Sequence, residues 1–213
     1  MEQQFWHERW ANDEIGFHQD TVTPLLEKYW DSLSYSSAGT VFVPLCGKSR
    51  DLVWLAQRGL KVVGVELSLT AVECFFAEND LMSEVDVTGD LRQFRCLSQP
   101  ITIYQGDFFG LSDDTVAESD VVFDRGALIA LPQIMRDTYV EKFARCLRPG
   151  TEILLVTLEH SSEKSPPFSL QESEVRDLYE NEFSVLRLGK NTDEFRGEMA
   201  MNVIYRLTKK SEN

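Results

Sequence analysis

Two short apolar runs with a helical segment between them constrain the fold of this chain more than any other feature. Thr40–Val43 and Lys61–Glu66 have the composition of strands, and residues 52–56 have the pattern of a helix that ends near Gly59. Continuous apolar strands are typical of a parallel sheet that is buried on both faces. Strands that alternate with helices in this way predict an α/β fold with a doubly wound, mostly parallel sheet.

The alternation continues towards the C-terminus. Three more segments have strand character and three have helical character: strands at 101–105, 119–124 and 152–158, and helices at 69–79, 132–147 and 171–181. Ser68 is placed to cap the first of these helices. Two last segments, 183–188 and 201–207, alternate enough to form an antiparallel edge strand pair. Residues 81–100 show no regular pattern. With no repeat or linker, we expect one domain over residues 1–213.

Residues 1–38 form a separate N-terminal segment in front of the first strand. Residues 5–10 predict a short helix in which Trp6 and Trp10 share one face, because they are four positions apart. Thr23 precedes a proline and is expected to cap a second helix.

The charge balance restricts the partners of the chain. It has 35 acidic and 21 basic residues, which gives a formal net charge of −14. A surface of this sign repels phosphate backbones and anionic membranes, so nucleic acid is not expected as a partner. No apolar run has the length of a membrane span, and the N-terminus does not have the pattern of a signal peptide. We therefore expect a cytoplasmic protein without a membrane partner.

Cysteine and histidine positions do not indicate a metal site. The four cysteines are scattered without a Cys-x-x-Cys pair, and the three histidines lack the spacing of metal ligands. We expect reduced thiols and no structural metal.

The loops after the first two strands carry the strongest chemical signal. In open α/β sheets, ligands bind beyond the carboxyl ends of the strands. The first strand runs into Pro44-Leu45-Cys46-Gly47-Lys48, and the second ends in Glu66. A glycine turn and a following acid at these places are the arrangement that binds an adenosine ribose through its hydroxyl groups.

Several adenosine-containing cofactors bind to a glycine turn followed by an acid, and the composition of this loop distinguishes between them. A dinucleotide site needs several glycines, whereas this loop has one, Gly47, beside Leu45 and Cys46. A nucleoside triphosphate site needs a glycine at the position of Phe42. The remaining adenosine cofactor carries no phosphates, which indicates S-adenosylmethionine. Taken alone, Glu66 and Gly47 also fit a structural strand end and turn.

The third and fourth strands end in further candidates. Asp107 and Phe108 follow the third strand, where an acid can meet an adenine amino group and an aromatic ring can cover the base; core packing is the alternative for the ring. Asp124 and Arg125 end the fourth strand. A permanent cation at Arg125 suits an anionic substrate, with Asp124 as a residue that orients it. The alternative is an ordinary surface ion pair. The Asn/Asp-Pro-Pro-aromatic motif of base N-methylation is absent.

These segments resemble the thiopurine S-methyltransferase family, and the bacterial members are closest in length. The resemblance extends from about Phe5 to Leu207. It rests on the N-terminal Trp6, Trp10 and Gly16-Phe17-His18, on Val41 to Lys48 with its Pro-Leu-Cys-Gly-Lys loop, on Val62-Val63-Gly64-Val65-Glu66, and on Asp124-Arg125-Gly126-Ala127-Leu128. The resemblance implies the Rossmann-like fold of class I S-adenosylmethionine-dependent methyltransferases.

The resemblance also implies roles for particular residues, although an acid at Asp107 is not a rule of the family. On the cofactor side they are Trp10, Leu45, Gly47, Glu66, Asp107, Phe108 and Arg125, and on the substrate side Phe17, Arg125 and Arg196. The N-terminal segment is expected to cover the cofactor as a lid, and the chain is expected to be a monomer.

The implied activity is methyl transfer to a thiopurine or another small aromatic or heterocyclic thiol, with S-adenosylhomocysteine as the product. This places the enzyme in xenobiotic metabolism. Selenium and tellurium species, as in metalloid detoxification, or a halide are alternative acceptors, and binding of S-adenosylmethionine without turnover is a further alternative. We expect an in-line displacement by a thiol sulfur in a dry pocket. No catalytic base is assigned, and Cys46 is not expected to be a nucleophile.

Overall fold

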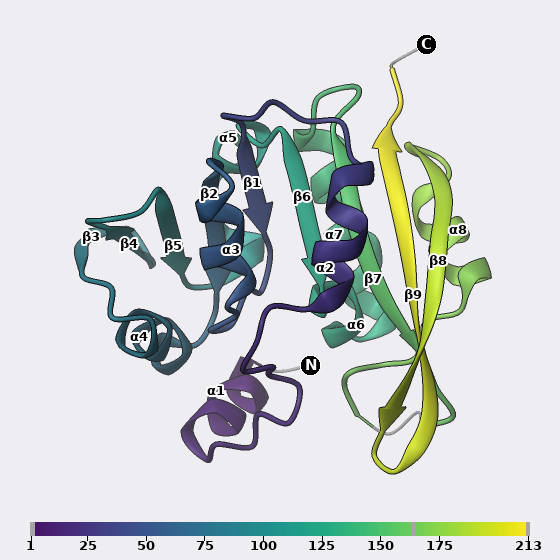
Figure 1. Cartoon of the computed structure of the whole chain (residues 1–213), viewed down its shortest axis with the longest axis horizontal. Coiled ribbons are helices and arrows are strands. Elements are labelled where there is room, and N and C mark those ends of the chain that lie inside the picture. The colour runs from purple at the N-terminus through teal and green to yellow at the C-terminus, as the bar shows by residue number, and fades with distance from the viewer. Residues whose placement is uncertain (1–2, 163–164, 212–213) are drawn as a thin grey trace.

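In the part of the chain that the structure describes, a nine-stranded mixed sheet forms the centre of the molecule (Figure 1). The computed structural model describes residues 3–162 and 165–211. Along the sheet the order is β3-β4-β5-β2-β1-β6-β7-β9-β8. The strands are β1 (Thr40–Val43), β2 (Lys61–Glu66), β3 (Ser83–Thr88), β4 (Leu91–Cys96), β5 (Ile101–Gln105), β6 (Val121–Arg125), β7 (Glu152–Glu159), β8 (Phe183–Phe195) and β9 (Glu198–Lys209).

The five central strands, β5-β2-β1-β6-β7, are parallel, as the sequence predicts. Both edges are antiparallel: β3 and β4 continue the sheet beyond β5, and β9 and β8 continue it beyond β7. The single antiparallel edge expected from the sequence is therefore one of two. The predicted first strand and second strand have the observed bounds.

Helices cover both faces of the sheet because the strand side chains alternate between two apolar clusters. Phe42 joins the cluster beneath α5 (Asp113–Ala117), α7 (Gln133–Cys146) and α8 (Glu172–Tyr179). Val41 and Val43 join the other cluster. The elements on that face are α2 (Pro24–Tyr29), the 3₁₀ turn η1 (Trp30–Ser32), α3 (Asp51–Gln57) and α4 (Leu69–Glu78).

Three short elements lie at the carboxyl ends of the parallel strands: α1 (Gln3–Ala11), the 3₁₀ turn η2 (Phe108–Gly110) and α6 (Ala127–Ala130). In Figure 1, α1 lies below the strand ends, and the turn of the β8–β9 hairpin reaches past the sheet at the same end. An N-terminal and a C-terminal segment of the chain thus lie beside the carboxyl ends of the parallel strands.

Local signals at the helix ends are partly confirmed. Ser68 caps α4 as predicted, since its hydroxyl accepts the Ala71 N–H. Thr23 occupies the predicted N-cap position of α2, in front of the proline, but its side chain makes no capping hydrogen bond. Instead, the Thr23 backbone N–H donates to Oδ1 of Asp51 over 2.9 Å. Within the residues described, no helix has both the length and the apolar character needed to cross a bilayer.

Candidate active site

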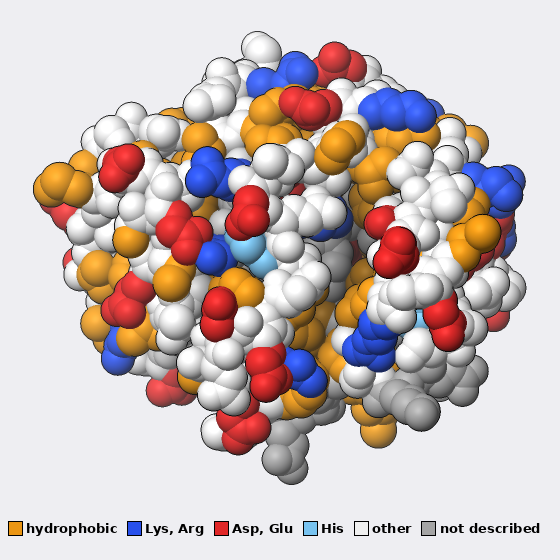
Figure 2. Space-filling model, turned by 60° about the horizontal axis from the view of Figure 1, so that its bottom comes forward, with side chains coloured by type: hydrophobic (Ala, Val, Ile, Leu, Met, Phe, Trp, Pro, Cys, Tyr) orange, Lys and Arg blue, Asp and Glu red, His pale blue; other side chains and the backbone are white. Residues whose placement is uncertain are grey.

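A cavity of about 600 Å³ opens at the carboxyl ends of β1, β2, β5 and β6. The loops after these strands form its floor, α1 and the following segment form one side, and the β8–β9 hairpin forms the other. Figure 2 shows this face of the molecule, which is hollowed by a cleft with apolar side chains in its walls. In α/β folds, ligands bind at the carboxyl ends of the parallel strands.

The loop after β1 has an unusual backbone. Leu45 and Gly47 both have positive φ angles, 46° and 54°. The loop is fixed to β2 by two hydrogen bonds: Cys46 N–H donates to the Val65 carbonyl over 3.0 Å, and Gly47 N–H donates to Oε2 of Glu66 over 2.9 Å. The glycine turn and Glu66, which the sequence predicts to lie at one site, are therefore in direct contact.

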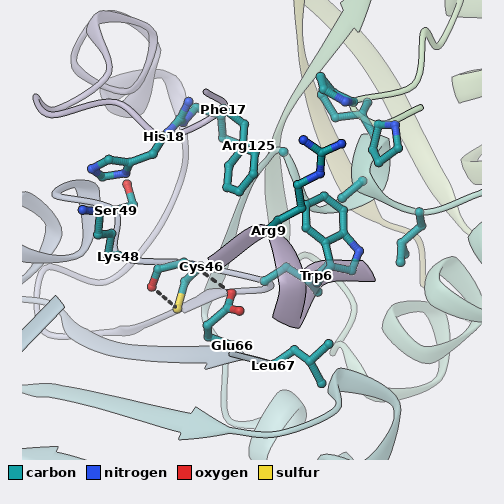
Figure 3. A pocket seen from close by; sticks show the side chains of 18 of the residues that line it. Trp6, Arg9, Phe17, His18, Cys46, Lys48, Ser49, Glu66, Leu67 and Arg125 are labelled. Atoms are coloured by element: carbon teal, nitrogen blue, oxygen red, sulfur yellow. Dashed lines mark hydrogen bonds between the residues drawn. The ribbon is translucent and has the colours of Figure 1, made fainter. Parts of the chain in front are cut away.

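Glu66 is a buried carboxylate in the floor of the cavity. Its side chain accepts the Gly47 N–H through one oxygen and the Ser68 N–H, over 2.8 Å, through the other. Figure 3 shows Glu66 below the glycine loop. Burial raises the pKa of Glu66, and these backbone N–H groups oppose the rise. Each carboxylate oxygen has a second lone pair, so Glu66 can still accept hydrogen bonds from a ligand.

The residues after β5 divide between cavity and core. Asp107 caps η2 by accepting the Phe109 N–H, and its other oxygen accepts the side-chain amide of Gln3 over 2.9 Å. Phe108 also borders the cavity, but it is 4% exposed and packs against Phe42 and Tyr139. Core packing, the alternative considered for Phe108, therefore accounts for most of its surface. Phe109 also borders the cavity and is less buried.

Arg125 lines the cavity and is held by a residue that the sequence analysis did not identify. Its Nε lies 3.3 Å from Oδ2 of Asp51, which is 1% exposed. The prediction that Asp124 orients Arg125 is wrong, because successive side chains of a strand point to opposite faces. Asp124 points away from the cavity and accepts the Tyr139 hydroxyl over 2.7 Å.

Asp124 is completely buried, and its role is structural. One oxygen accepts the N–H groups of Ala127 and Leu128, at the start of α6, and the other accepts the Tyr139 hydroxyl. Burial raises the pKa of Asp124 to about 6, although these hydrogen bonds favour the charged form. The carboxylate thus fixes the turn that follows β6.

This raised pKa predicts a pH-dependent cost to stability. The unfolded chain ionises Asp124 near pH 4 and the folded chain near pH 6, so the folded state binds more protons between these values and stability falls as pH rises. Asp124→Asn removes this dependence. Relative to the variant, the wild type is expected to lose about 2 kcal/mol of unfolding free energy between pH 4 and pH 7, measured by urea denaturation. Parallel stability curves for the two proteins would contradict the assignment.

An aromatic cluster from the N-terminal segment covers the loop after β1, which holds Gly47 and is called the cofactor loop below. Phe17 makes edge contacts with Trp6 and Trp10, with ring centroids 5.6 and 5.7 Å apart. Trp10 is 7% exposed and lies over Gly47, where an added Cβ would be 3.2 Å from its ring. Figure 3 shows Trp6 and Phe17 at the cavity together with Arg125. The structure therefore brings these predicted residues together.

Arg196 lies at the tip of the β8–β9 hairpin and also borders the cavity. Its guanidinium donates to Ser162 and Ser165 over 3.2 and 2.7 Å and to the Pro166 carbonyl. It is exposed, and the loop after β7 engages it. These contacts anchor the hairpin to that loop.

Gln3, Arg9 and His18 are among the other cavity residues to which the sequence analysis gave no role. Gln3 and Arg9 come from α1, and His18 follows the aromatic cluster. Burial lowers the pKa of His18, and the nearby Lys48 lowers it further. Asp51 could have been identified from the sequence, because it is an acid in the first helical turn after the glycine loop. No sequence pattern marks Gln3 or Arg9 as cavity residues.

Cys46 is buried beside Glu66. Burial, followed by the charge of Glu66, raises the pKa of its thiol well above the ordinary value. A thiol in this state is a poor nucleophile, in agreement with the sequence-based expectation.

The residues around Gly47 fit S-adenosylmethionine better than a phosphate-bearing nucleotide. The Gly47 N–H is donated to Glu66 and is not available to a phosphate. Glu66 and Asp107 add negative charge to the cavity, which suits a ribose and a cationic sulfonium.

Solved structures with the same fold include two methyltransferases with bound S-adenosylhomocysteine. The Burkholderia thailandensis 1,6-didemethyltoxoflavin-N1-methyltransferase has a TM-score of 0.70 at 14% identity, covering 98% of this chain and 87% of that one. The Synechocystis magnesium protoporphyrin IX methyltransferase has a TM-score of 0.65 at 13% identity, covering 96% and 99%. At this identity the likeness is one of fold.

The fold and the site define a class I S-adenosylmethionine-dependent methyltransferase. The model of the family described as Thiopurine S-methyltransferase (TPMT) matches residues 1–210. The chain belongs to the thiopurine S-methyltransferase family.

Curated bacterial relatives named thiopurine S-methyltransferase agree with this placement. The protein of Pseudomonas fluorescens is 44% identical over 181 residues, 84% of this chain and 82% of the relative. The protein of Shewanella woodyi is 48% identical over 176 residues, 80% and 78% of the two chains. The predicted family, enzyme class and cofactor are thereby confirmed.

Proposed function

We propose that this enzyme methylates the sulfur of a small aromatic or heterocyclic thiol that carries a negative charge. The observation that carries the proposal is Arg125, a permanent cation in a cavity that also has apolar lining residues. These include Ile129, Val156, Leu158 and Phe195. A flat ring suits these apolar side chains, and an anionic group suits the guanidinium.

The cofactor side of the cavity is proposed to lie between α1 and the loops after β1, β2 and β5. Glu66 accepts the ribose hydroxyls, Leu45 and Gly47 shape the loop, and Trp10 closes it from above. Asp107 and the neighbouring ring of Phe108 or Phe109 flank the adenine. The supporting contacts are those of Glu66 with Gly47 and of Trp10 over Gly47.

The substrate side is proposed to include Phe17, Arg125 and Arg196. S-adenosylmethionine supplies an electrophilic methyl group on a positively charged sulfur. Arg125 favours the ionised form of an acidic acceptor and orients it. The aromatic cluster of Trp6, Trp10 and Phe17 acts as a lid that excludes water from the cavity. No side chain is assigned as a general base.

The N-terminal segment has the contacts expected of a lid over the cofactor loop. Gln3 donates to Asp107, and Trp10 covers Gly47. The net charge of −14 favours a small molecule over nucleic acid as the acceptor.

Calorimetric titration followed by a methyl-transfer assay tests the proposal. The protein is expected to bind S-adenosylhomocysteine and to methylate 2-mercaptobenzoate faster than thiophenol at limiting substrate, because only the former carries a carboxylate. Cofactor binding with transfer to selenite or tellurite but not to either thiol would favour the metalloid alternative. Cofactor binding without any transfer would contradict a thiol methyltransferase.

A further inference from the structure

Asp51 connects three separate segments of the chain at the edge of the cavity. It is the first residue of α3, directly after the loop that holds Gly47, and its side chain is 1% exposed. One oxygen faces Arg125 at the end of β6, and the other faces the backbone of Thr23 before α2. A carboxylate buried to this extent is retained only when its charge and lone pairs are compensated.

The contact with Arg125 fixes the plane of the guanidinium. Oδ2 of Asp51 lies 3.3 Å from Nε of Arg125, whose side chain is 19% exposed. A guanidinium has five N–H donors in a rigid planar group. Because Asp51 takes the Nε–H, the two terminal nitrogens carry the remaining four donors. An arginine that is anchored in this way has little rotational freedom left. It therefore loses less conformational entropy when it binds an anion.

The contact with Thr23 reaches the base of the lid. Oδ1 of Asp51 accepts the Thr23 N–H over 2.9 Å, and Thr23 is 2% exposed. Residues 14 and 16–19, shortly before Thr23, line the cavity. The same carboxylate therefore holds both the substrate-facing cation and the point at which the N-terminal segment joins the body of the protein.

We propose that Asp51 is a positioning residue for the methyl acceptor. It fixes the orientation of the Arg125 guanidinium in the cavity, and it links this orientation to the position of the N-terminal segment through Thr23. The inference rests on the proposed function, because it takes the acceptor of Arg125 to be an anionic thiol. Asp51 itself does not contact the substrate.

A double-mutant cycle tests whether Asp51 acts through Arg125. Asp51→Asn keeps an oxygen for the Thr23 N–H but removes the charge that faces Arg125. It is expected to raise the KM for 2-mercaptobenzoate about tenfold and to change the KM for thiophenol less than about twofold. In an Arg125→Ala background the same substitution is expected to have no further effect on either KM. Independent, multiplicative effects of the two substitutions would overturn the proposal.

Asp120 provides a control at the opposite end of the sheet with the same two kinds of partner. It combines an arginine, Arg148 at 2.9 Å, with a backbone N–H, that of Thr40 at 2.8 Å, in a pair that is more exposed than that of Asp51. Asp120→Asn removes a carboxylate–arginine pair away from the cavity and is expected to leave both KM values unchanged. An equal rise in KM in the Asp120 and Asp51 variants would indicate a general loss of stability and would also overturn the proposal.

A spectroscopic measurement separates this inference from the proposed function, because it needs no ligand. The ¹⁵N–¹H signal of Arg125 Nε, assigned with Arg125→Lys, is expected to be protected from solvent exchange in the wild type and to lose that protection in Asp51→Asn. An unprotected Nε–H in the wild type would overturn the role of Asp51, whatever the enzyme methylates. Protection without thiol methylation would retain the Asp51–Arg125 contact and reject only the proposed substrate.

Discussion

Glu66→Gln is expected to reduce the affinity for S-adenosylhomocysteine about 100-fold, equal to about 2.7 kcal/mol. The carboxylate accepts two backbone N–H groups, from Gly47 and Ser68, with its two oxygens. A glutamine has one oxygen, so its NH₂ group must face one of these donors. The loop would then shift, and the acceptor offered to the ribose would be neutral. Isothermal titration calorimetry measures the loss.

The control for Glu66 is Glu152, a glutamate of equal burial at the amino end of β7. Both side chains are 6% exposed, and Glu152 also accepts a backbone N–H, that of Ser34 over 2.6 Å. Glu152→Gln is expected to lower stability without changing the cofactor affinity. An unchanged affinity in Glu66→Gln would mean that Glu66 only fixes the loop, which is the structural alternative left open by the sequence.

Gly47→Ala is expected to weaken S-adenosylhomocysteine binding about 30-fold, equal to about 2 kcal/mol. Gly47 has a φ of +54°, and an added Cβ would lie 3.2 Å from the Trp10 ring. The alanine therefore strains the backbone and also pushes the ring that covers the loop. The backbone strain alone costs about 1 kcal/mol of stability.

Gly150 separates these two effects. Its φ is +86°, and an added Cβ would meet nothing within 4 Å. Gly150→Ala is expected to cost similar stability in urea denaturation while cofactor affinity stays at the wild-type level. If both alanine variants bind S-adenosylhomocysteine equally well, the contact of the Trp10 ring with Gly47 does not contribute to cofactor binding. The proposed lid would then lose its main support.

The central strands could be predicted from sequence because they are buried on both faces and read as continuous apolar runs. The β3–β4 hairpin could not, because most of β3 is exposed on both faces, including Val85 and Val87. Its contacts are pairing with β5, the exposed ion pairs of Arg95 with Glu84 and Asp86, and one buried ring, Phe94, which stacks on Phe76. A single buried residue does not produce a hydrophobic period.

The length of the last two strands was underestimated for a related reason. The predicted strand 183–188 lies within β8, which continues to Phe195. Past Gly189 the hairpin carries mostly exposed polar side chains, so the pattern that marks a half-buried strand ends before the strand does. The tip that brings Arg196 to the cavity is in this second part.

Site residues next to the glycine loop were predictable because the loop and the strand ends are local features. The partner of Arg125 was not. Asp51 lies 74 positions before Arg125, and only the parallel pairing of β1 with β6 brings the two together. Asp124 was favoured because it is adjacent in sequence, yet adjacent strand residues face opposite sides of the sheet.

The distribution of the four tryptophans gives the enzyme two distinct optical environments. Trp6 and Trp10 line the cavity, whereas Trp30 and Trp54 pack against each other with ring centroids 6.4 Å apart, away from the cavity. Trp30 is fully buried and donates its indole N–H to Tyr35. A ligand that enters the cavity alters the emission of the first pair and leaves the second as an internal reference. Intrinsic fluorescence can therefore follow occupancy of the cavity without a label.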